Sequence, residues 1–339
     1  KLKSQAGFEL GARESFLLFN NILLVIAAAT VFAGTMAPLI SDSLGLGTLS
    51  VGAPSFNPTF MLSMLPLAAL VAIGISANWK RGRLGEKTRT LLTTLAIAAV
   101  VACIVVFGIY SKGKILTPVA ATLGIWIIVT SLVDPVDRLR RGLSLSRSVI
   151  GMTVAHIGLG IFVLSLTTVE SFTQEHDVSL ARGASTSVGA YAFRFDGVKA
   201  LEGPNYEGVG GTVAVTRNGE PLTVLYPEKR QYFVQHTTTT EAAIEMHYGS
   251  NILVALGEDL GAGKWSVRIQ IRPLVNLVWL GAFIMALGGG IAASDRRYRV
   301  TKTAEETAEV PGAVASVAAG GRIASVPAAA PGSAGARSP

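Results

Sequence analysis

Six apolar runs of about 20 residues, separated by polar loops, constrain this fold more than any other feature of the sequence. A helix needs a run of this length to cross the hydrocarbon core of a bilayer. Only 15% of the residues are charged, which is fewer than soluble domains carry. The sequence therefore predicts a polytopic α-helical membrane protein with about six transmembrane helices, at approximately residues 16–40, 59–78, 91–110, 115–133, 149–169 and 274–293.

The basic residues predict how these helices are oriented. Lys and Arg precede the first span, fill the loops after the second and fourth spans, and follow the sixth span. The loop after the first span has none, and the loop after the third has only Lys112 and Lys114. By the positive-inside rule, both termini lie in the cytoplasm. The net charge of +7 is then explained by the Lys and Arg residues that orient the spans, and we expect no nucleic-acid partner.

The long segment between the fifth and sixth spans has a different hydrophobic pattern. Residues 170–273 show alternating strand-like patterns such as "YAFRFDGV" and "KWSVRIQIR", and Asn218-Gly219 is a type I′ hairpin signal. We expect a small all-β domain, a sandwich or barrel, in the periplasm. Within it, "TEAAIEMH" is interpreted as one or two helical turns capped by Thr240.

The predicted organisation is four segments. Residues 1–169 hold transmembrane helices one to five, 170–273 the β-domain, and 274–300 the sixth helix with a basic cytoplasmic end. Residues 301–339 are rich in Ala, Gly, Pro, Ser and Val, and predict a disordered low-complexity tail. The chain begins with Lys rather than Met, so we expect a fragment of a longer protein.

One histidine, His156, lies inside the fifth predicted span, where an ionisable residue is costly and usually functional. A hydrogen bond between helices, a proton relay and metal ligation would each explain it. Small residues surround it (Gly151, Ala155, Gly158 and Gly160), and could let a flat macrocycle approach the backbone. Imidazole is a standard axial ligand of haem iron, and its second ring nitrogen would need an acceptor such as a backbone carbonyl. Close helix packing around small residues stays open as the alternative.

Other polar residues of the predicted β-domain have ordinary explanations beside functional ones. We expect three histidines on the solvated surface: His176, His236 and His247. Adjacent charges at 228–230 would point to opposite faces of a strand and pair poorly. Lys229 and Arg230 could meet a haem propionate or an acidic partner, or could simply lie on a solvated sheet face.

Polar residues in and beside the apolar spans also need partners. Asn20 and Asn21 predict a polar contact between helices, with a quinone head group as the alternative. Asp134 and Asp137 are expected to pair with local arginines, beside Pro135, which would end the fourth helix. Cys103 is the single cysteine, which excludes an internal disulfide and a zinc site built on cysteines.

Several stretches resemble the C-terminal half of the cytochrome c-type biogenesis protein CcmF family of haem lyases. They include "ESFLLFNNILLVIAAATVFAGTMAPLI", "GMTVAHIGLGIFVLSL", "YPEKRQYF" and "MALGGGIAASDRRYR". The resemblance runs in order from about residue 10 to about residue 300. It implies attachment of haem to the CxxCH motifs of apocytochromes c outside a bacterial cytoplasmic (inner) membrane.

The resemblance also implies a cofactor. Members of the family hold a haem b in the membrane through two histidines from separate helices, and His156 matches one of these axial iron ligands. The second ligand and the tryptophan-rich segment that handles the substrate haem would lie upstream of residue 1. The four tryptophans present are scattered. No catalytic residue is therefore assigned to this chain, which we expect to be catalytically incomplete alone.

The implied partners are the N-terminal half with its tryptophan-rich segment, a haem chaperone, thiol-reducing apocytochrome-binding subunits, the apocytochrome c and the lipid bilayer. Two alternatives remain at this point. The chain could be a non-catalytic membrane scaffold that recruits maturation partners, or a haem-transport subunit.

Overall fold

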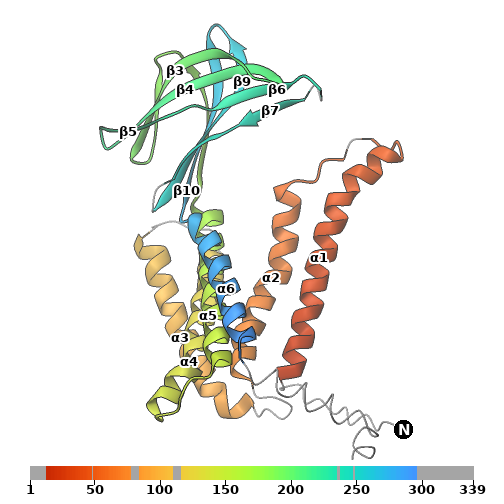
Figure 1. Ribbon diagram of the computed structural model, residues 1–339, viewed down its shortest axis with the longest axis vertical. Coiled ribbons are helices and arrows are strands. Elements are labelled where there is room, and N and C mark those ends of the chain that lie inside the picture. Colours follow the sequence, from red (N-terminus) through yellow and green to blue (C-terminus); the bar gives the residue numbers. More distant parts are fainter. Residues whose placement is uncertain are drawn as a thin grey trace, which may run out of the picture. The chain divides into compact units, whose positions relative to one another are not determined.

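The computed structural model describes residues 13–47, 49–77, 84–109, 116–234, 237–246 and 249–295 (Figure 1). The predicted tail at 301–339 lies outside the described residues, as do His236 and His247. The described part contains six long helices and ten strands. The helices are α1 (Arg13–Ser43), α2 (Ala53–Ser76), α3 (Leu84–Ile109), α4 (Thr117–Arg140), α5 (Arg147–Phe172) and α6 (Asn276–Ala293).

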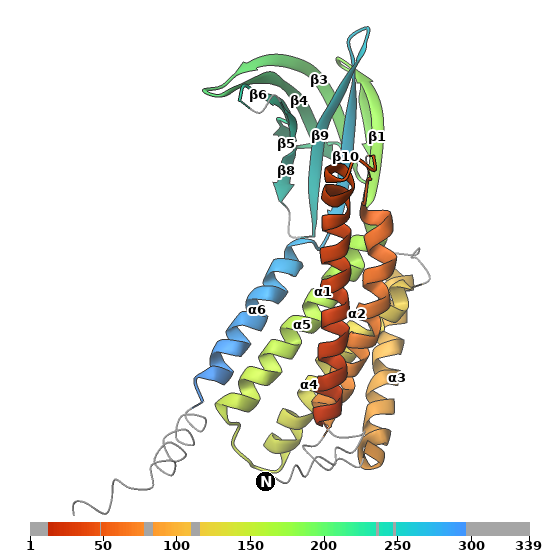
Figure 2. The same ribbon diagram turned by 90° about the vertical axis from the view of Figure 1, so that its right-hand side faces the viewer.

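All six helices are long and apolar enough to cross a membrane, which confirms the predicted fold class. Their outer surfaces carry many exposed large apolar side chains, such as Leu18, Val25 and Phe32 on α1. In a soluble protein such a surface would aggregate, whereas in a bilayer lipid or other helices cover it. Helix α5 packs against both α4 and α6, and α1 packs on α2, as Figure 2 shows.

Helix α4 does not end at Pro135, contrary to the prediction. It continues to Arg140, with Pro135 inside it. A proline leaves the carbonyl four residues earlier without its helical donor, which here is the carbonyl of Ser131. The hydroxyl of Thr153 on α5 lies 3.5 Å from that oxygen. A hydroxyl of a neighbouring helix thus lies beside the freed carbonyl, and its single proton is shared with the carbonyl of Val149, 2.9 Å away.

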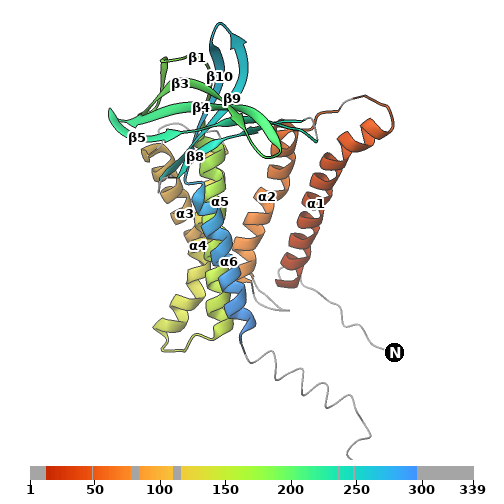
Figure 3. The same ribbon diagram turned by 45° about the horizontal axis from the view of Figure 1, so that its top comes forward.

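The β-domain consists of two antiparallel sheets, visible in Figure 3. One sheet has the order β1-β10-β9-β8, formed by β1 (Gln174–Ala181), β10 (Lys264–Pro273), β9 (Ser250–Gly261) and β8 (Ala243–Met246). The other has the order β2-β3-β4-β6-β7, formed by β2 (Ser185–Val188), β3 (Tyr191–Glu202), β4 (Tyr206–Arg217), β6 (Glu228–Tyr232) and β7 (Thr238–Glu241), while β5 (Glu220–Leu225) also pairs with β4.

Apolar side chains from both sheets form the core of this domain. Phe193, Phe195 and Val213 from one sheet and Ile252 and Ile269 from the other are buried in the same cluster. They alternate with more exposed residues along their strands, which is the pattern that the sequence showed. The hairpin at Asn218-Gly219 is also present, with positive φ angles of 50° and 88°, and joins β4 to β5.

The prediction of a short helix in "TEAAIEMH" was wrong. Thr238–Glu241 form β7 and Ala243–Met246 form β8, and the two strands belong to different sheets. Thr240 pairs with Lys229 of β6, and Ile244 pairs with Leu253 of β9. Backbone pairing with two long-range partners therefore prevails over the local helix propensity of Glu and Ala.

Hydrogen bonds connect the β-domain to the helices at the start of α6. Ser165 Oγ of α5 donates to the carbonyl of Leu274, 2.7 Å away. Asn251 of β9 and Asn276 of α6 exchange two side-chain hydrogen bonds of 2.9 and 3.0 Å. These contacts hold the junction between β10, which ends at Pro273, and α6, which begins at Asn276.

Candidate functional site

His156 lies near the middle of α5, which begins with a regular N-cap: the Ser146 hydroxyl accepts a hydrogen bond from the amide of Val149. The His156 ring is half-buried, and its Nδ1 lies 2.7 Å from the carbonyl oxygen of Met152. A carbonyl can only accept, so Nδ1 carries the proton and donates it. Nε2 is then the nitrogen with a free lone pair, which is the state that a metal ligand requires.

The small residues around His156 serve helix packing on the α6 side. A Cβ on Gly158 would lie 2.7 Å from the amide nitrogen of Met285, and one on Gly151 would lie 2.4 Å from that of Ala292. Gly281 and Gly288 of α6 face α5 in the same way. The space that these glycines leave is therefore filled by the backbone of α6, and the interpretation of it as room for a macrocycle was wrong.

The glycine on the neighbouring face of α5 packs against α4. A Cβ on Gly160 would lie 2.8 Å from the carbonyl of Gly124 and 2.4 Å from a side-chain carbon of Ile128. Gly160 follows His156 by four residues, so the two share a face. Gly158 lies about 160° away around the helix. His156 is thus turned away from the α6 contact and lies at the edge of the contact with α4.

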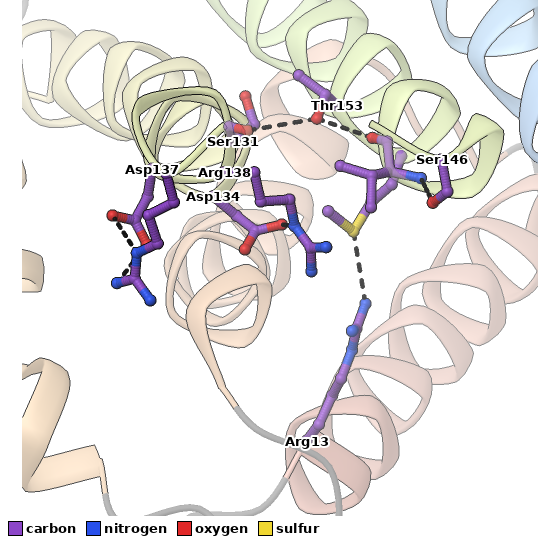
Figure 4. A network of polar contacts seen from close by, with 10 residues as sticks. Arg13, Ser131, Asp134, Asp137, Arg138, Ser146 and Thr153 are labelled. Carbon is purple, nitrogen blue, oxygen red and sulfur yellow. Dashed lines mark hydrogen bonds and ion pairs between the residues drawn. The ribbon is translucent and has the colours of Figure 1, made fainter. Parts of the chain in front are cut away.

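Met152, one turn before His156, connects this face to α1. Its carbonyl orients the imidazole, and its Sδ lies 3.8 Å from Nη2 of Arg13, the first residue of α1 (Figure 4). In the sequence, Arg13 is one of the basic residues that precede the first span and indicate its orientation. The contact spans 139 positions, and only the i to i+4 spacing of Met152 and His156 could have indicated that both face the same way.

Carboxylates near this end of the helices pair as predicted with local arginines. Asp134 accepts from Arg138 at 2.8 Å, and Asp137 pairs with Arg141 at the same distance. Each pair is an i, i+4 contact at the end of α4, and Figure 4 draws both pairs. Each of these acids is therefore paired with an arginine four residues later in the sequence.

The described residues contain no group of three or more metal-ligating side chains. Among the described residues, His156 therefore does not belong to a cluster of that kind. His176, the other described histidine, lies on β1 and is exposed, as expected. Cys103 is also exposed, on α3.

Asn20 of α1 has a side-chain oxygen without a hydrogen-bond partner among the described residues. Its Oδ1 is buried and has no hydrogen-bond partner among the described residues, so the predicted contact between helices is not found there. Asn21 is exposed. Buried polar atoms are nearly always paired, which marks Asn20 as a position that lacks a partner in this part of the chain.

The charged residues of β6 pair more fully than predicted. Glu228 and Arg230 are two positions apart, so they share a face and form a salt bridge of 2.6 Å. Arg230 also lies 4.5 Å above the ring of Tyr206. Lys229, only 15% exposed, pairs with Glu258 of β9. Each of these cations is already held by a neighbouring carboxylate.

Comparison with known proteins relates this combination of helices and β-sandwich to one family. Residues 171–273 match the family model described as the CcmF C-terminal beta-sandwich. The cytochrome c-type biogenesis protein CcmF of Pseudomonas fluorescens is 39% identical over 88% of this chain and 46% of that protein. CcmF of Escherichia coli K12 is 38% identical over 91% of this chain and 48% of that protein. The chain is similar to the C-terminal half of these CcmF proteins.

The solved structure of a cytochrome c haem lyase CcmF has the same fold. It superposes with a TM-score of 0.66 and 21% identity, over 84% of this chain and 46% of that one. The chain thus spans about half the length of the CcmF proteins that it matches. The relationship includes both the helices and the β-sandwich, because it extends well beyond the residues 171–273 of the family model.

Proposed function

We propose that the chain is the C-terminal half of a haem lyase subunit for cytochrome c maturation, which holds a membrane haem b through His156. Relatives named for cytochrome c-type biogenesis support this proposal. The observation that carries it is the hydrogen bond from Nδ1 of His156 to the Met152 carbonyl, which leaves Nε2 free to bind iron.

The residues of this half would position the ligand. The Met152 carbonyl fixes the imidazole tautomer, while α4 and α6 hold α5 on two faces through its glycines. When bound, haem b would supply a one-electron redox centre within the membrane, which suits the need to keep the substrate haem ferrous. Thioether bonds to the CxxCH motifs would form on the periplasmic side, beside the β-domain.

The same proposal includes the cellular setting. The chain would be a multi-pass protein of the bacterial inner membrane with both ends of the helical part in the cytoplasm, as the distribution of Lys and Arg supports. Its partners would be the N-terminal half, a haem chaperone, the thiol-reducing subunits and apocytochrome c. The remaining haem ligand and the handling of substrate haem belong to the N-terminal half.

An absorption spectrum tests the ligand assignment. The chain is purified in detergent with and without the N-terminal half, as wild type, His156→Ala and the matched control His176→Ala. We expect sharp reduced α and β bands only when both halves are present, unchanged in His176→Ala and absent in His156→Ala. Full haem occupancy in the folded His156→Ala protein would refute the assignment.

A non-catalytic scaffold is the second candidate, because α5 packs tightly through glycines whether or not haem is bound. In that case His156 would serve only to orient α5, and the β-domain would recruit partners. A haem-free wild-type complex of both halves would favour this candidate. A haem-transport role would instead predict haem that dissociates readily from the complex.

A further inference from the structure

Arg13 is a cation for which the described residues provide no charged partner. Its side chain is half-buried, and its recorded contact is with the sulfur of Met152 at 3.8 Å. A thioether is a weak acceptor, whereas a guanidinium has five donors. The two carboxylates at the end of α4, Asp134 and Asp137, already pair with Arg138 and Arg141.

The position of Arg13 relates it to the proposed iron ligand. Met152 contacts Arg13 of α1 through its sulfur (Figure 4). His156 follows Met152 by four residues and bonds to its carbonyl, so Met152 and His156 share one face of α5. Arg13 lies at the level of Met152, which is one helical turn nearer than His156 to the end of the bundle at which α1 and α5 begin. A planar ligand bound at Nε2 could therefore have its edge within reach of the guanidinium.

A second polar residue, Asn20, lies on the same side of α1 as Arg13. Asn20 follows Arg13 by seven residues, two turns of helix, so both residues lie on one side of α1. The buried Oδ1 of Asn20 lacks a donor among the described residues. Among the described residues, Arg13 has no counter-charge and Asn20 Oδ1 has no donor. Two such side chains on one side of a helix are typical of a surface that binds a polar group.

We infer that Arg13 binds a propionate of the haem that His156 ligates, so that the propionate edge of the haem faces the end of the bundle at which α1 and α5 begin. The inference rests on the proposed function. Carboxylate is the chemistry that a guanidinium recognises best, through two parallel hydrogen bonds. A phospholipid headgroup is the other anion available to an arginine near the end of a membrane helix, and the test separates the two.

The test uses the complex of both halves with Arg13→Gln, which removes the charge, and Arg13→Lys, which keeps it. Arg141→Gln is the matched control, because it removes an exposed arginine from the loop that connects α4 to α5. Two quantities are measured: the rate of haem transfer to apomyoglobin and the midpoint potential of the bound haem. Circular dichroism confirms that each variant is folded.

We expect Arg13→Gln to lose haem about tenfold faster than wild type, since a hydrogen bond to a charged group contributes roughly 1.4 kcal/mol or more. Its midpoint potential should fall, because a nearby cation favours the ferrous state, which carries one positive charge less. Arg13→Lys should lie between, and Arg141→Gln should match wild type.

If Arg13→Gln keeps the wild-type rate and potential while His156→Ala is haem-free, Arg13 meets only lipid and the inference is overturned. The proposed function would then still stand. If the wild-type complex itself holds no haem, the proposed function fails and the inference fails with it.

Discussion

The contact between α5 and α6 depends on glycines, and Gly288→Ala tests this directly. A Cβ on Gly288 would lie 2.3 Å from the amide nitrogen of Ala155 and 2.7 Å from the carbonyl oxygen of Gly151. Both atoms belong to the backbone of α5, so no side chain can rotate to make room. The two helices must therefore move apart.

The magnitude follows from these distances. Heavy atoms in contact normally lie about 3.5 Å apart, so the helices would separate by about 1 Å. Overpacking of this kind costs roughly 1–3 kcal/mol of unfolding free energy. Alanine gains about 1 kcal/mol over glycine in helix propensity, so the expected net loss relative to wild type is about 0–2 kcal/mol.

The matched control is Gly289→Ala, because nothing lies within 4 Å of a Cβ at that position. It gains the same propensity without the clash, and the difference between the two variants isolates the helix contact. We would measure unfolding in a titration of dodecyl maltoside micelles with sodium dodecyl sulfate, followed by tryptophan fluorescence. Equal stability of Gly288→Ala and Gly289→Ala would refute the close approach of α5 and α6.

Three further predictions concern other contacts. Arg268 lowers the pKa of Asp177 through a hydrogen bond, so this pair stabilises the fold above the unfolded pKa and the contribution is lost as the pH falls below about 4. The effect is small because both side chains are 53% exposed, and Arg268→Gln should remove this acid dependence in pH-resolved thermal unfolding. Thr153→Val should cost under about 1 kcal/mol in the detergent titration, since its single hydroxyl proton is shared between the carbonyls of Ser131 and Val149; no loss would mean that Ser131 finds another donor. Phe193→Ala should cost about 3–5 kcal/mol and unfold the β-domain at lower temperature by circular dichroism, because Phe193 is fully buried between the two sheets; a small loss would mean that the core collapses around the gap.

Much of the fold could be predicted because its signals are local. Hydropathy over about 20 residues indicates a membrane helix without any knowledge of its neighbours. The alternation in "YAFRFDGV" and the turn at Asn218-Gly219 likewise depend on adjacent residues alone. The errors occurred where a distant partner decides. Pro135 stays helical with Thr153 of another helix beside the carbonyl it frees, and residues 240–246 are strands because β6 and β9 pair with them.

The candidate site divides in the same way. His156 could be found from the sequence, because an isolated histidine in an apolar run is conspicuous, and its need for an acceptor on the second nitrogen follows from imidazole chemistry. Arg13 could not be found, because an arginine before an apolar run is ordinarily a topological signal. Its proximity to Met152 depends on how α1 packs, and no spacing in the sequence reports this.

The glycines of α5 show why composition alone leaves a site undetermined. Gly158 and Gly160 both follow His156 within four residues, yet one faces α6 and the other faces α4. A haem that reached Nε2 through either contact would have to displace a helix backbone. We therefore expect it to approach over the sector that carries His156 and Met152, where Met152 contacts Arg13 of α1. A second axial ligand from the N-terminal half would then have to come from that side, so a cysteine crosslink from the N-terminal half to a residue beside Met152 should form more readily than one to the α6-facing side of α5.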